Sequence, residues 1–328
     1  MARYARIPAE LTTGPFHRRT ALAAGVTDVQ LRSRPWKLLI REVYCLETLK
    51  VTPEVLLQAL LLAVPPHAVI TGKTAAWLYG AWEPDPRKPM PLECTLGPEG
   101  PRFSRRGVTT HRLELGQADF CEEQGLRVTS PARTCFGLMA AAPSLTEAVV
   151  IIDAFRHNNV VTAAEIVEYA NRRPRWPHVR KVRAAVTLSD PATESPMESR
   201  MRMVLVLGGL PWPHVNRPFY DADGNFVARP DDSYLRPDTG IEYLGAYHFT
   251  PEQRVLDDVR ENSMLTRGMP TLKYDKNAVY FEPDRIIADV VRLRPDLRPS
   301  GPLDLGELYA GRLHISRPEE PPTSAHVA

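Results

Sequence analysis

Two short segments near the C-terminal end, each apolar and each carrying an acid, constrain the fold more than any other feature. Residues 226–231 read Phe-Val-Ala-Arg-Pro-Asp, and residues 241–245 read Ile-Glu-Tyr-Leu-Gly. Both are typical of strands, and adjacent strands bring their carboxylates to one edge of a sheet. A pair of carboxylates there forms an oxygen-rich site suited to Mg²⁺. The sequence therefore predicts an acidic sheet edge built from Asp231 and Glu242.

The neighbouring motifs extend this pattern. Glu-Ser-Pro-Met-Glu-Ser-Arg (194–200), Ala-Arg-Pro-Asp (228–231) and Glu-Tyr-Leu-Gly-Ala-Tyr-His (242–248) occur in this order. Together they resemble an endonuclease-like family of the PD-(D/E)XK superfamily, which is related to very-short-patch repair endonucleases. The resemblance covers roughly residues 190–295. It implies a restriction-endonuclease-like mixed sheet flanked by helices.

The resemblance also implies an activity, namely Mg²⁺-dependent hydrolysis of DNA. Asp231 and Glu242 are the implied metal ligands, and Mg²⁺ would lower the pKa of a bound water that attacks phosphorus. Glu198 is the implied helix-borne acid, and His248 is the implied general acid/base. The superfamily's lysine falls on Leu244. We expect Arg254 or Arg260 to supply the missing positive charge, and we expect both to contact DNA.

Glu198 also has a structural interpretation. Ser195 fits a helix N-cap, Pro196 a first helical residue, and Glu198 the third position of a capping box. Both interpretations of Glu198 stay open at this point. Asp231 differs, because an acid that follows Ala-Arg-Pro at the end of a strand has no capping role. We expect Asp232 and Asp238 to be turn residues.

The N-terminal region is locally basic although the whole chain carries a formal charge of only +2. Residues 1–50 hold nine Lys or Arg and four acids, and residues 172–183 hold six Lys or Arg and no acid. Such patches suit a phosphate backbone, although solvated surface is an equally good explanation of each patch alone.

Residues 16–45 are predicted to form a small winged helix. A helix that ends at Gly25, a second helix capped by Thr27, and a hairpin over residues 36–44 follow one another. This order is similar to the N-terminal domain of AbiEi-type antitoxins, which are transcriptional repressors of type IV toxin–antitoxin systems. The resemblance implies DNA binding through a recognition helix that begins near Thr27. The expected DNA contacts in this region are Arg18, Arg19, Gln30, Arg32, Arg34 and Lys37.

The predicted fold class is α/β, in the sense of a multidomain α+β protein. Residues 1–50 form the winged helix, 51–190 a small α+β middle domain with a helical connector, 191–296 the nuclease-like domain, and 297–328 a Pro-rich flexible tail. The predicted helices in the middle and C-terminal parts are residues 53–64, 71–80, 131–141, 145–157, 162–171, 178–188, 201–207 and 283–293, with strands at 92–96, 107–113 and 272–274.

Cysteine usage and the N-terminus predict a cytoplasmic protein without membrane partners. Cys45, Cys94, Cys121 and Cys135 are widely spaced, so neither a zinc site nor a disulfide framework is indicated. The first residues lack the apolar core of a signal peptide. The longest apolar run, residues 55–64, is too short to cross a bilayer.

Two functions from different classes are the main candidates, and a protein-interaction module in which the C-terminal sheet serves only as scaffold is a third. The first is a Mg²⁺-dependent DNA endonuclease in defence or repair with a DNA-binding N-terminal module. The alternative is a non-catalytic transcriptional regulator or antitoxin, paired with a toxin partner, whose nuclease fold has lost its chemistry. Leu244 motivates the alternative, because leucine neither binds a metal nor stabilises negative charge.

Overall fold

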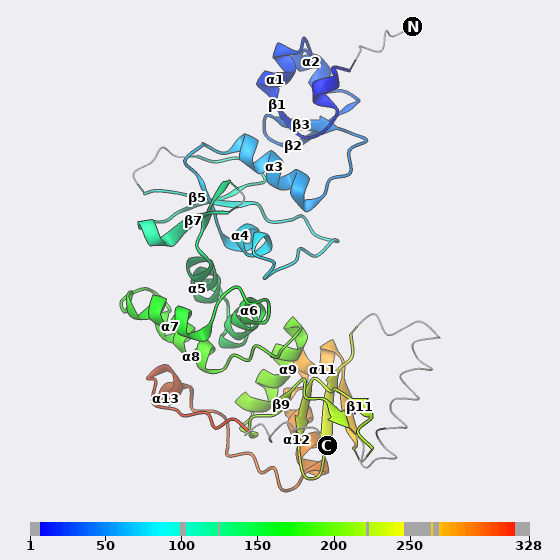
Figure 1. Ribbon diagram of the computed structural model, residues 1–328, viewed down its shortest axis with the longest axis vertical. Coiled ribbons are helices and arrows are strands. Elements are labelled where there is room, and N and C mark those ends of the chain that lie inside the picture. Colours follow the sequence, from blue (N-terminus) through cyan, green and yellow to red (C-terminus); the bar gives the residue numbers. More distant parts are fainter. Residues whose placement is uncertain are drawn as a thin grey trace. The chain divides into compact units, whose positions relative to one another are not determined.

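A computed structural model describes residues 7–98, 103–123, 125–220, 223–245, 264 and 269–318. It divides into two compact units, Met1–Gly137 and Leu138–Ala328. Helices and several separate sheets occur in both units (Figure 1), so the predicted multidomain α+β class is confirmed. The predicted domain boundaries at residues 50, 190 and 296 lie within these units.

The first unit begins with a small helical region closed by a three-stranded sheet of order β1-β3-β2. Its elements are the short 3-10 helix η1 (Ala9–Leu11), β1 (Phe16–His17), α1 (Arg18–Ala23), α2 (Asp28–Leu31), β2 (Trp36–Ile40) and β3 (Val43–Leu46). Gly25 has a positive φ of 84° and ends α1, and Val26 donates to the carbonyl of Ala21. The helix, glycine turn, second helix and hairpin thus follow in the order that the sequence predicts.

The rest of the first unit is built on a five-stranded sheet of order β6-β5-β4-β8-β7. Its elements are α3 (Pro53–Ala63), β4 (Val69–Ile70), α4 (Gly72–Leu78), β5 (Glu93–Leu96), β6 (Thr109–Arg112), η2 (Gln117–Asp119), β7 (Phe120–Glu123) and β8 (Leu126–Thr129). Strand β7 was not predicted, because Phe-Cys-Glu-Glu holds no β-branched residue. Apolar side chains from the sheet, α3 and α4 form one core.

The helical region agrees closely with the sequence pattern. Its helices are α5 (Pro131–Ala141), α6 (Leu145–His157), α7 (Ala163–Asn171) and α8 (Val179–Thr187). Ser144 and Thr162 cap α6 and α7 by accepting backbone hydrogen bonds from Glu147 and Glu165. Because each of these two starts has a capping side chain and each interior is periodic, the predicted ends are correct to within a residue.

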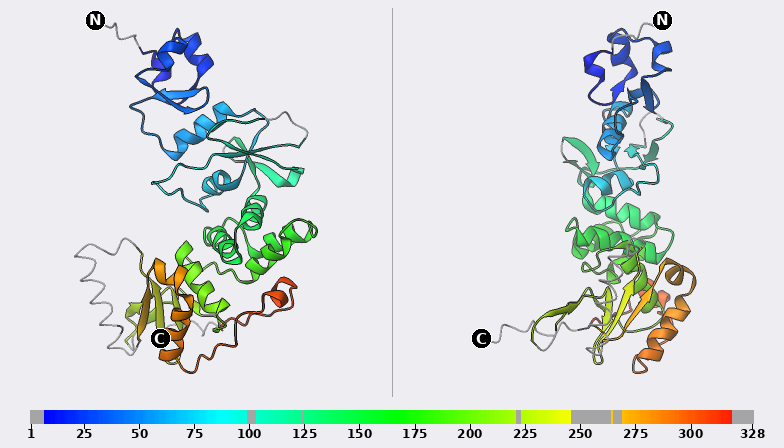
Figure 2. Two further views of the ribbon diagram at one scale, coloured as in Figure 1. Left: turned by 180° about the vertical axis from the view of Figure 1, so that it is seen from behind. Right: turned by 90° about the vertical axis from the view of Figure 1, so that its right-hand side faces the viewer.

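The second unit also contains a four-stranded mixed sheet of order β14-β13-β12-β9. The elements around it are α9 (Pro196–Leu207), β9 (His214–Val215), β10 (Phe219–Tyr220), β11 (Phe226–Ala228), β12 (Asp232–Tyr234), β13 (Thr239–Tyr243), β14 (Thr271–Tyr274), α11 (Lys276–Phe281), α12 (Pro283–Leu293) and α13 (Leu305–Tyr309). Strands β12 and β13 are antiparallel, whereas β13 and β14 are parallel. Helices α9 and α12 pack on one face of the sheet through Met201, Ile241 and Ile286. In the right-hand view of Figure 2, the hairpin β10–β11 (yellow-green) projects on the side opposite helix α12 (orange).

The structure corrects two expectations about this sheet. Residues 226–228 do form a strand, β11, but it pairs with β10 in a separate two-stranded sheet. Asp231 lies beside β13 because the chain turns after β11 and starts a further strand, β12. Asp232 is therefore no turn residue: it belongs to β12 and is 1% exposed. Asp238 does lie in the turn between β12 and β13.

A buried charged network joins α6, α9 and the segment that follows α8. The Asp153 carboxylate accepts hydrogen bonds from the Ser199 hydroxyl (2.8 Å) and the Asp190 backbone N–H (2.7 Å), and it forms an ion pair with Arg202. Arg202 also donates to the carbonyl of Leu188 over 2.7 Å. Burial nevertheless raises the pKa of Asp153 to about 6, against the opposing effect of Arg202.

The prediction of a flexible tail from residue 297 is wrong for residues 300–317. Ser300 and Leu303 donate backbone hydrogen bonds to the carbonyls of Gly209 and Leu207. The Arg317 guanidinium lies 4.3 Å from the ring centroid of Trp212 and donates to the carbonyl of Ser189 over 2.7 Å. The high proline content of this segment led to the expectation of flexibility. Proline disfavours regular secondary structure, but it does not prevent the chain from packing.

Candidate functional site

The two predicted metal ligands lie near each other at one end of the β12–β13 pair, since Glu242 belongs to β13 and Asp231 immediately precedes β12. Asp232 and Ile241 are register partners in the antiparallel pair β12–β13, so Asp231 faces Glu242 one step further along. Directly opposed residues of an antiparallel pair point to the same face of the sheet, with Cβ atoms about 5 Å apart. Both side chains are half-buried. Tertiary folding thus brings Asp231 and Glu242 together, as expected.

Asp231 has a structural contact that the sequence did not predict. Its Oδ2 atom accepts a 2.7 Å hydrogen bond from the backbone N–H of Tyr243, and its carbonyl accepts one of 2.9 Å from Asn216. This contact is not a helix cap, but it gives Asp231 a structural role at the edge of the sheet. The side chain takes the place of a ladder carbonyl at the end of β12. This contact orients the carboxylate next to Glu242.

Glu198 reaches the same region from the first turn of α9. Its Oε2 atom accepts hydrogen bonds from the Asn216 side chain and from the backbone of Glu194, both 2.8 Å long. Asn216 thus links Glu198 to the strand end that carries Asp231. The predicted cap is confirmed for Ser195, which accepts from the Glu198 N–H over 3.2 Å. The reciprocal bond of a capping box goes instead to Glu194, one residue earlier than expected.

Arg229 and Glu194 form an exposed pair beside these acids. The guanidinium binds both carboxylate oxygens of Glu194, with 2.9 Å between Nη2 and Oε2. This hydrogen bonding raises the pKa of Arg229, and the nearby charges of Glu198 and Asp231 act in the same direction. Arg229 is therefore a cation at the margin of an acidic cluster, although it already has a carboxylate partner.

Asp232 faces the opposite side of the sheet, toward the core. Neither of its oxygens has a hydrogen-bond partner within the part of the chain that the structure describes. Burial raises the pKa of this carboxyl well above its usual range. Arg202 offsets the effect only partly. A protonated carboxyl avoids the cost of a buried unpaired charge, so Asp232 is suited to the core rather than to a metal site.

The described residues fit a Mg²⁺ site of two protein ligands. Among them, no group of three or more His, Cys, Asp or Glu side chains is arranged to hold a metal. Mg²⁺, however, commonly uses one or two carboxylates and completes its octahedron with waters and substrate phosphates. Asp231 and Glu242 meet that smaller requirement. His248, Arg254 and Arg260, the other residues predicted for this site, lie outside the described ranges.

In the N-terminal region, three of the predicted DNA contacts already have partners within the protein. The Arg18 guanidinium binds both oxygens of Asp28, with 2.6 Å between Nε and Oδ1. Arg34 lies 3.2 Å from Glu47. Gln30 accepts hydrogen bonds from the backbone N–H and hydroxyl of Thr27, which completes a capping box at α2.

These contacts correct the expected recognition helix. Thr27 caps α2 as predicted, but the helix spans only Asp28–Leu31. Gln30 is committed to the cap, and Arg34 lies beyond the end of the helix. Arg32 and Lys37 are exposed, as is Arg19. They are the better candidates for contacts with a phosphate backbone.

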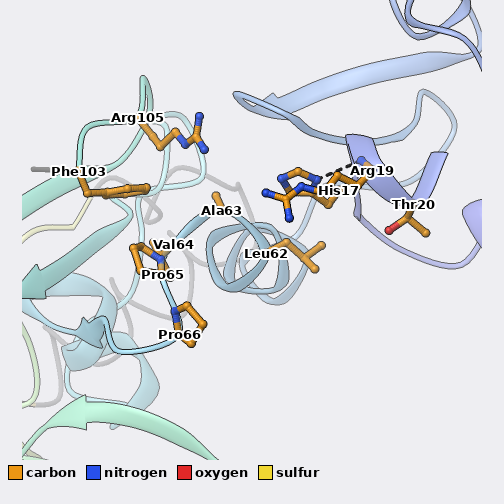
Figure 3. A pocket seen from close by; sticks show the side chains of 10 residues that line it. All are labelled: His17, Arg19, Thr20, Leu62, Ala63, Val64, Pro65, Pro66, Phe103 and Arg105. Atoms are coloured by element: carbon orange, nitrogen blue, oxygen red, sulfur yellow. Dashed lines mark hydrogen bonds between the residues drawn. The ribbon is translucent and has the colours of Figure 1, made fainter. Parts of the chain in front are cut away.

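A cleft of about 520 Å³ lies within the first unit (Figure 3). Its lining comprises His17, Arg19, Thr20, Leu62, Ala63, Val64, Pro65, Pro66, Phe103 and Arg105. Burial and the neighbouring Arg19 lower the pKa of His17, and its Nδ1 accepts from the Arg19 N–H over 3.1 Å. The neutral ring therefore carries its proton on Nε2. The cleft combines an apolar floor with cationic walls.

Sequence reasoning missed Asn216, Arg202 and Lys273. Asn216 and Arg202 carry no motif signal, because their importance comes from partners distant in sequence. Lys273 follows an apolar residue in a predicted strand, and only pairing with β13 places it next to Glu242. Once the pairing of β14 with β13 is known, the alternation of side chains along a strand indicates which face of the sheet Lys273 occupies.

Comparisons with known proteins add little to this geometry. The sequence matches no model of a protein family and no curated protein. Among solved structures, the chain is similar to the RV2827C protein from Mycobacterium tuberculosis, with 14% identity and a TM-score of 0.37, over 63% of this chain and 84% of that one. In the described ranges, no helix has the length and apolar character that crossing a membrane would need.

Proposed function

We propose that this protein binds DNA and that its C-terminal sheet hydrolyses DNA with Mg²⁺. The observation that supports the proposal is the antiparallel pairing of β12 with β13, which brings Asp231, the residue just before β12, next to the strand end that carries Glu242. The resemblance to an endonuclease-like family of the PD-(D/E)XK superfamily supports the same conclusion. Its implied mixed sheet flanked by helices agrees with the β14-β13-β12-β9 sheet and helices α9 and α12.

Each residue of the site has a distinct task in this proposal. Asp231 and Glu242 would hold the metal, which supplies positive charge to a phosphate and acidifies a bound water. The Tyr243 N–H fixes the Asp231 carboxylate. Glu198 and Asn216 brace the strand end through their 2.8 Å hydrogen bond. His248 remains the proton carrier that the sequence predicts.

A nicking assay tests the proposal directly. Purified full-length protein is incubated with supercoiled plasmid and Mg²⁺ or Mn²⁺, next to an Asp231→Asn variant and a Glu242→Gln variant. We expect metal-dependent nicking by the wild-type protein and a loss of at least about 100-fold in both variants. Equal nicking by all three proteins would assign the activity to a contaminant and refute the proposal.

A non-catalytic regulator is the second candidate, and one observation favours it. Leu244, at the place of the superfamily's lysine, is 40% exposed and apolar. The N-terminal part has a helix–turn–helix–hairpin arrangement. Together with Leu244, this arrangement suits an AbiEi-type antitoxin that represses transcription and binds a toxin partner. Gel shifts on the DNA upstream of its own gene would test this role. Promoter binding without nicking would favour the regulator over the nuclease.

A further inference from the structure

One more charged residue lies in the same row as the two acids. Glu242 on β13 and Lys273 on β14 are register partners in the parallel pair. Register partners of adjacent strands point to the same face of a sheet. Asp231, Glu242 and Lys273 therefore occupy one row across the end of β12, β13 and β14. All three are half-buried.

The core contacts of the neighbouring residues support this placement. Tyr274 is a buried member of the core under α9 and α12, and Leu272 packs against that core. Because side chains alternate between the faces of a strand, Lys273 points to the other face. Ile241 belongs to the same core, so Glu242 also points away from it. The strand register and the core contacts therefore place Lys273 on the same face of the sheet as the acids.

We propose that Lys273 is the cationic residue of this site and contacts the phosphate that is hydrolysed. This inference rests on the proposed nuclease function. During hydrolysis the water oxygen bonds to phosphorus, the bond from phosphorus to the leaving sugar oxygen breaks, and a proton of the water ends on that oxygen. Lys273 stabilises the negative charge that grows on a non-bridging oxygen.

Leu244 explains why the positive charge of the site would come from Lys273. Leu244 lies two residues after Glu242 and continues the ladder, since its N–H donates to the carbonyl of Tyr274 over 2.8 Å. It shares the face of Glu242 but has no charge. Lys273 supplies from the next strand what Leu244 lacks. A lysine at either position would present an ammonium to a phosphate above this row.

Four variants of the full-length protein test the role of Lys273. Lys273→Met removes the charge, and Lys273→Arg keeps it on a different geometry. Lys276→Met is the control, because Lys276 is an exposed lysine at the start of α11. Leu244→Lys is combined with Lys273→Met as a rescue. Single-turnover nicking in Mg²⁺, DNA affinity in Ca²⁺, and thermal unfolding are measured for each protein.

We expect Lys273→Met to slow nicking about 100- to 1000-fold, with DNA affinity and unfolding temperature close to the wild type. Lys273→Arg should keep part of the activity, Lys276→Met all of it, and the Leu244→Lys double variant should recover at least about tenfold. Nicking by Lys273→Met at the wild-type rate, or a loss of nicking rate that unfolding explains, would refute the proposed role of Lys273. Either result would leave the proposed nuclease function in place. Absence of nicking in the wild type would overturn the proposed function and this inference together.

Discussion

The Oδ2 atom of Asp231 accepts a 2.7 Å hydrogen bond from the backbone N–H of Tyr243. The carboxylate completes the β12–β13 ladder, and under the proposed function it has a second purpose, which is to hold Mg²⁺ together with Glu242. These purposes have different chemical requirements. The hydrogen bond needs only an acceptor oxygen, whereas a metal site needs the negative charge.

Substitutions of Asp231 should separate the two purposes. Asparagine keeps an acceptor oxygen for the Tyr243 N–H, so the free energy of unfolding of Asp231→Asn should stay within about 0.5 kcal/mol of the wild type while nicking is lost. Asp231→Ala removes the acceptor as well, and its free energy of unfolding should fall further, by about 1 to 3 kcal/mol. Urea unfolding and plasmid nicking are measured in parallel. Full nicking by Asp231→Asn would show that the charge is not needed.

Removing Arg202 should strongly destabilise the second unit. Its side chain is 1% exposed and is the ion-pair partner of Asp153. Loss of one member leaves a buried carboxylate without its charge partner, so Arg202→Met should lower the free energy of unfolding by about 3 to 5 kcal/mol. Urea denaturation followed by tryptophan fluorescence measures the change.

An exposed ion pair provides the matched control. Arg172 lies 3.0 Å from Glu168 on the surface of α7, and Arg172→Ala should change the free energy of unfolding by less than about 1 kcal/mol. Adding Asp153→Asn to Arg202→Met should recover part of the loss, since the remaining partner is then neutral. A double variant less stable than either single variant would contradict this account of the pair.

Asp153 should make stability depend on pH. Its pKa is raised by burial from the ordinary 3.8 to about 6. Between these values the folded protein binds more protons than the unfolded chain, so this group lowers the free energy of unfolding as the pH rises from about 4 to about 6. Burial raises the pKa of Asp232 too, which acts in the same direction.

The measurement compares wild type with Asp153→Asn across that pH range, so that the titration of all other carboxyl groups cancels. The stability difference, wild type minus variant, should decrease with rising pH and level off above about pH 6. A difference that increases over this range would show that Arg202 outweighs burial and depresses the pKa of Asp153.

In the N-terminal region, Arg32 and Lys37 should matter for DNA binding and Gln30 should not. Arg32→Ala and Lys37→Ala each remove an exposed charge, so each should weaken binding similarly for all DNA sequences. The slope of log affinity against log salt should fall by about one for each phosphate that the variant no longer neutralises. Fluorescence anisotropy with a labelled duplex at several salt concentrations measures both quantities.

Gln30→Ala serves as the comparison in the same assay. Because Gln30 holds the N-terminus of α2 through its contacts with Thr27, the variant should lose up to about 1 kcal/mol of stability and keep its salt slope. If Gln30→Ala weakened DNA binding as much as Lys37→Ala, Gln30 would be a DNA contact after all.

Local signals in the sequence explain how much of the fold was predictable. Helices α5, α6 and α12 begin and end within a residue of their predicted bounds, because proline, serine caps and 3.6-residue periodicity are encoded locally. Strands with alternating or β-branched residues were predicted as well. The helices and strands that were missed or misplaced, such as β7 and the end of α2, lack such signals.

Only the acidic residues of the candidate site could be predicted from the sequence. The motif pieces indicated Asp231, Glu242 and Glu198, since residue types at a fixed spacing are visible in one dimension. Their contacts were not visible. Asn216 joins Glu198 to the strand of Asp231 from a turn, and Lys273 reaches the row only through the parallel pairing of β14.

The sequence by itself determined the order and type of most elements, the basic N-terminus and the identity of the two acids, Asp231 and Glu242. Tertiary structure alone decided which strands pair, and with that which face each charge occupies. It placed Asp232 in the core and Asp231 opposite Glu242, although the two aspartates are adjacent in the chain. The physical reason is the two-residue period of a strand: a shift of one residue moves a side chain to the other face, and strand pairing fixes that register.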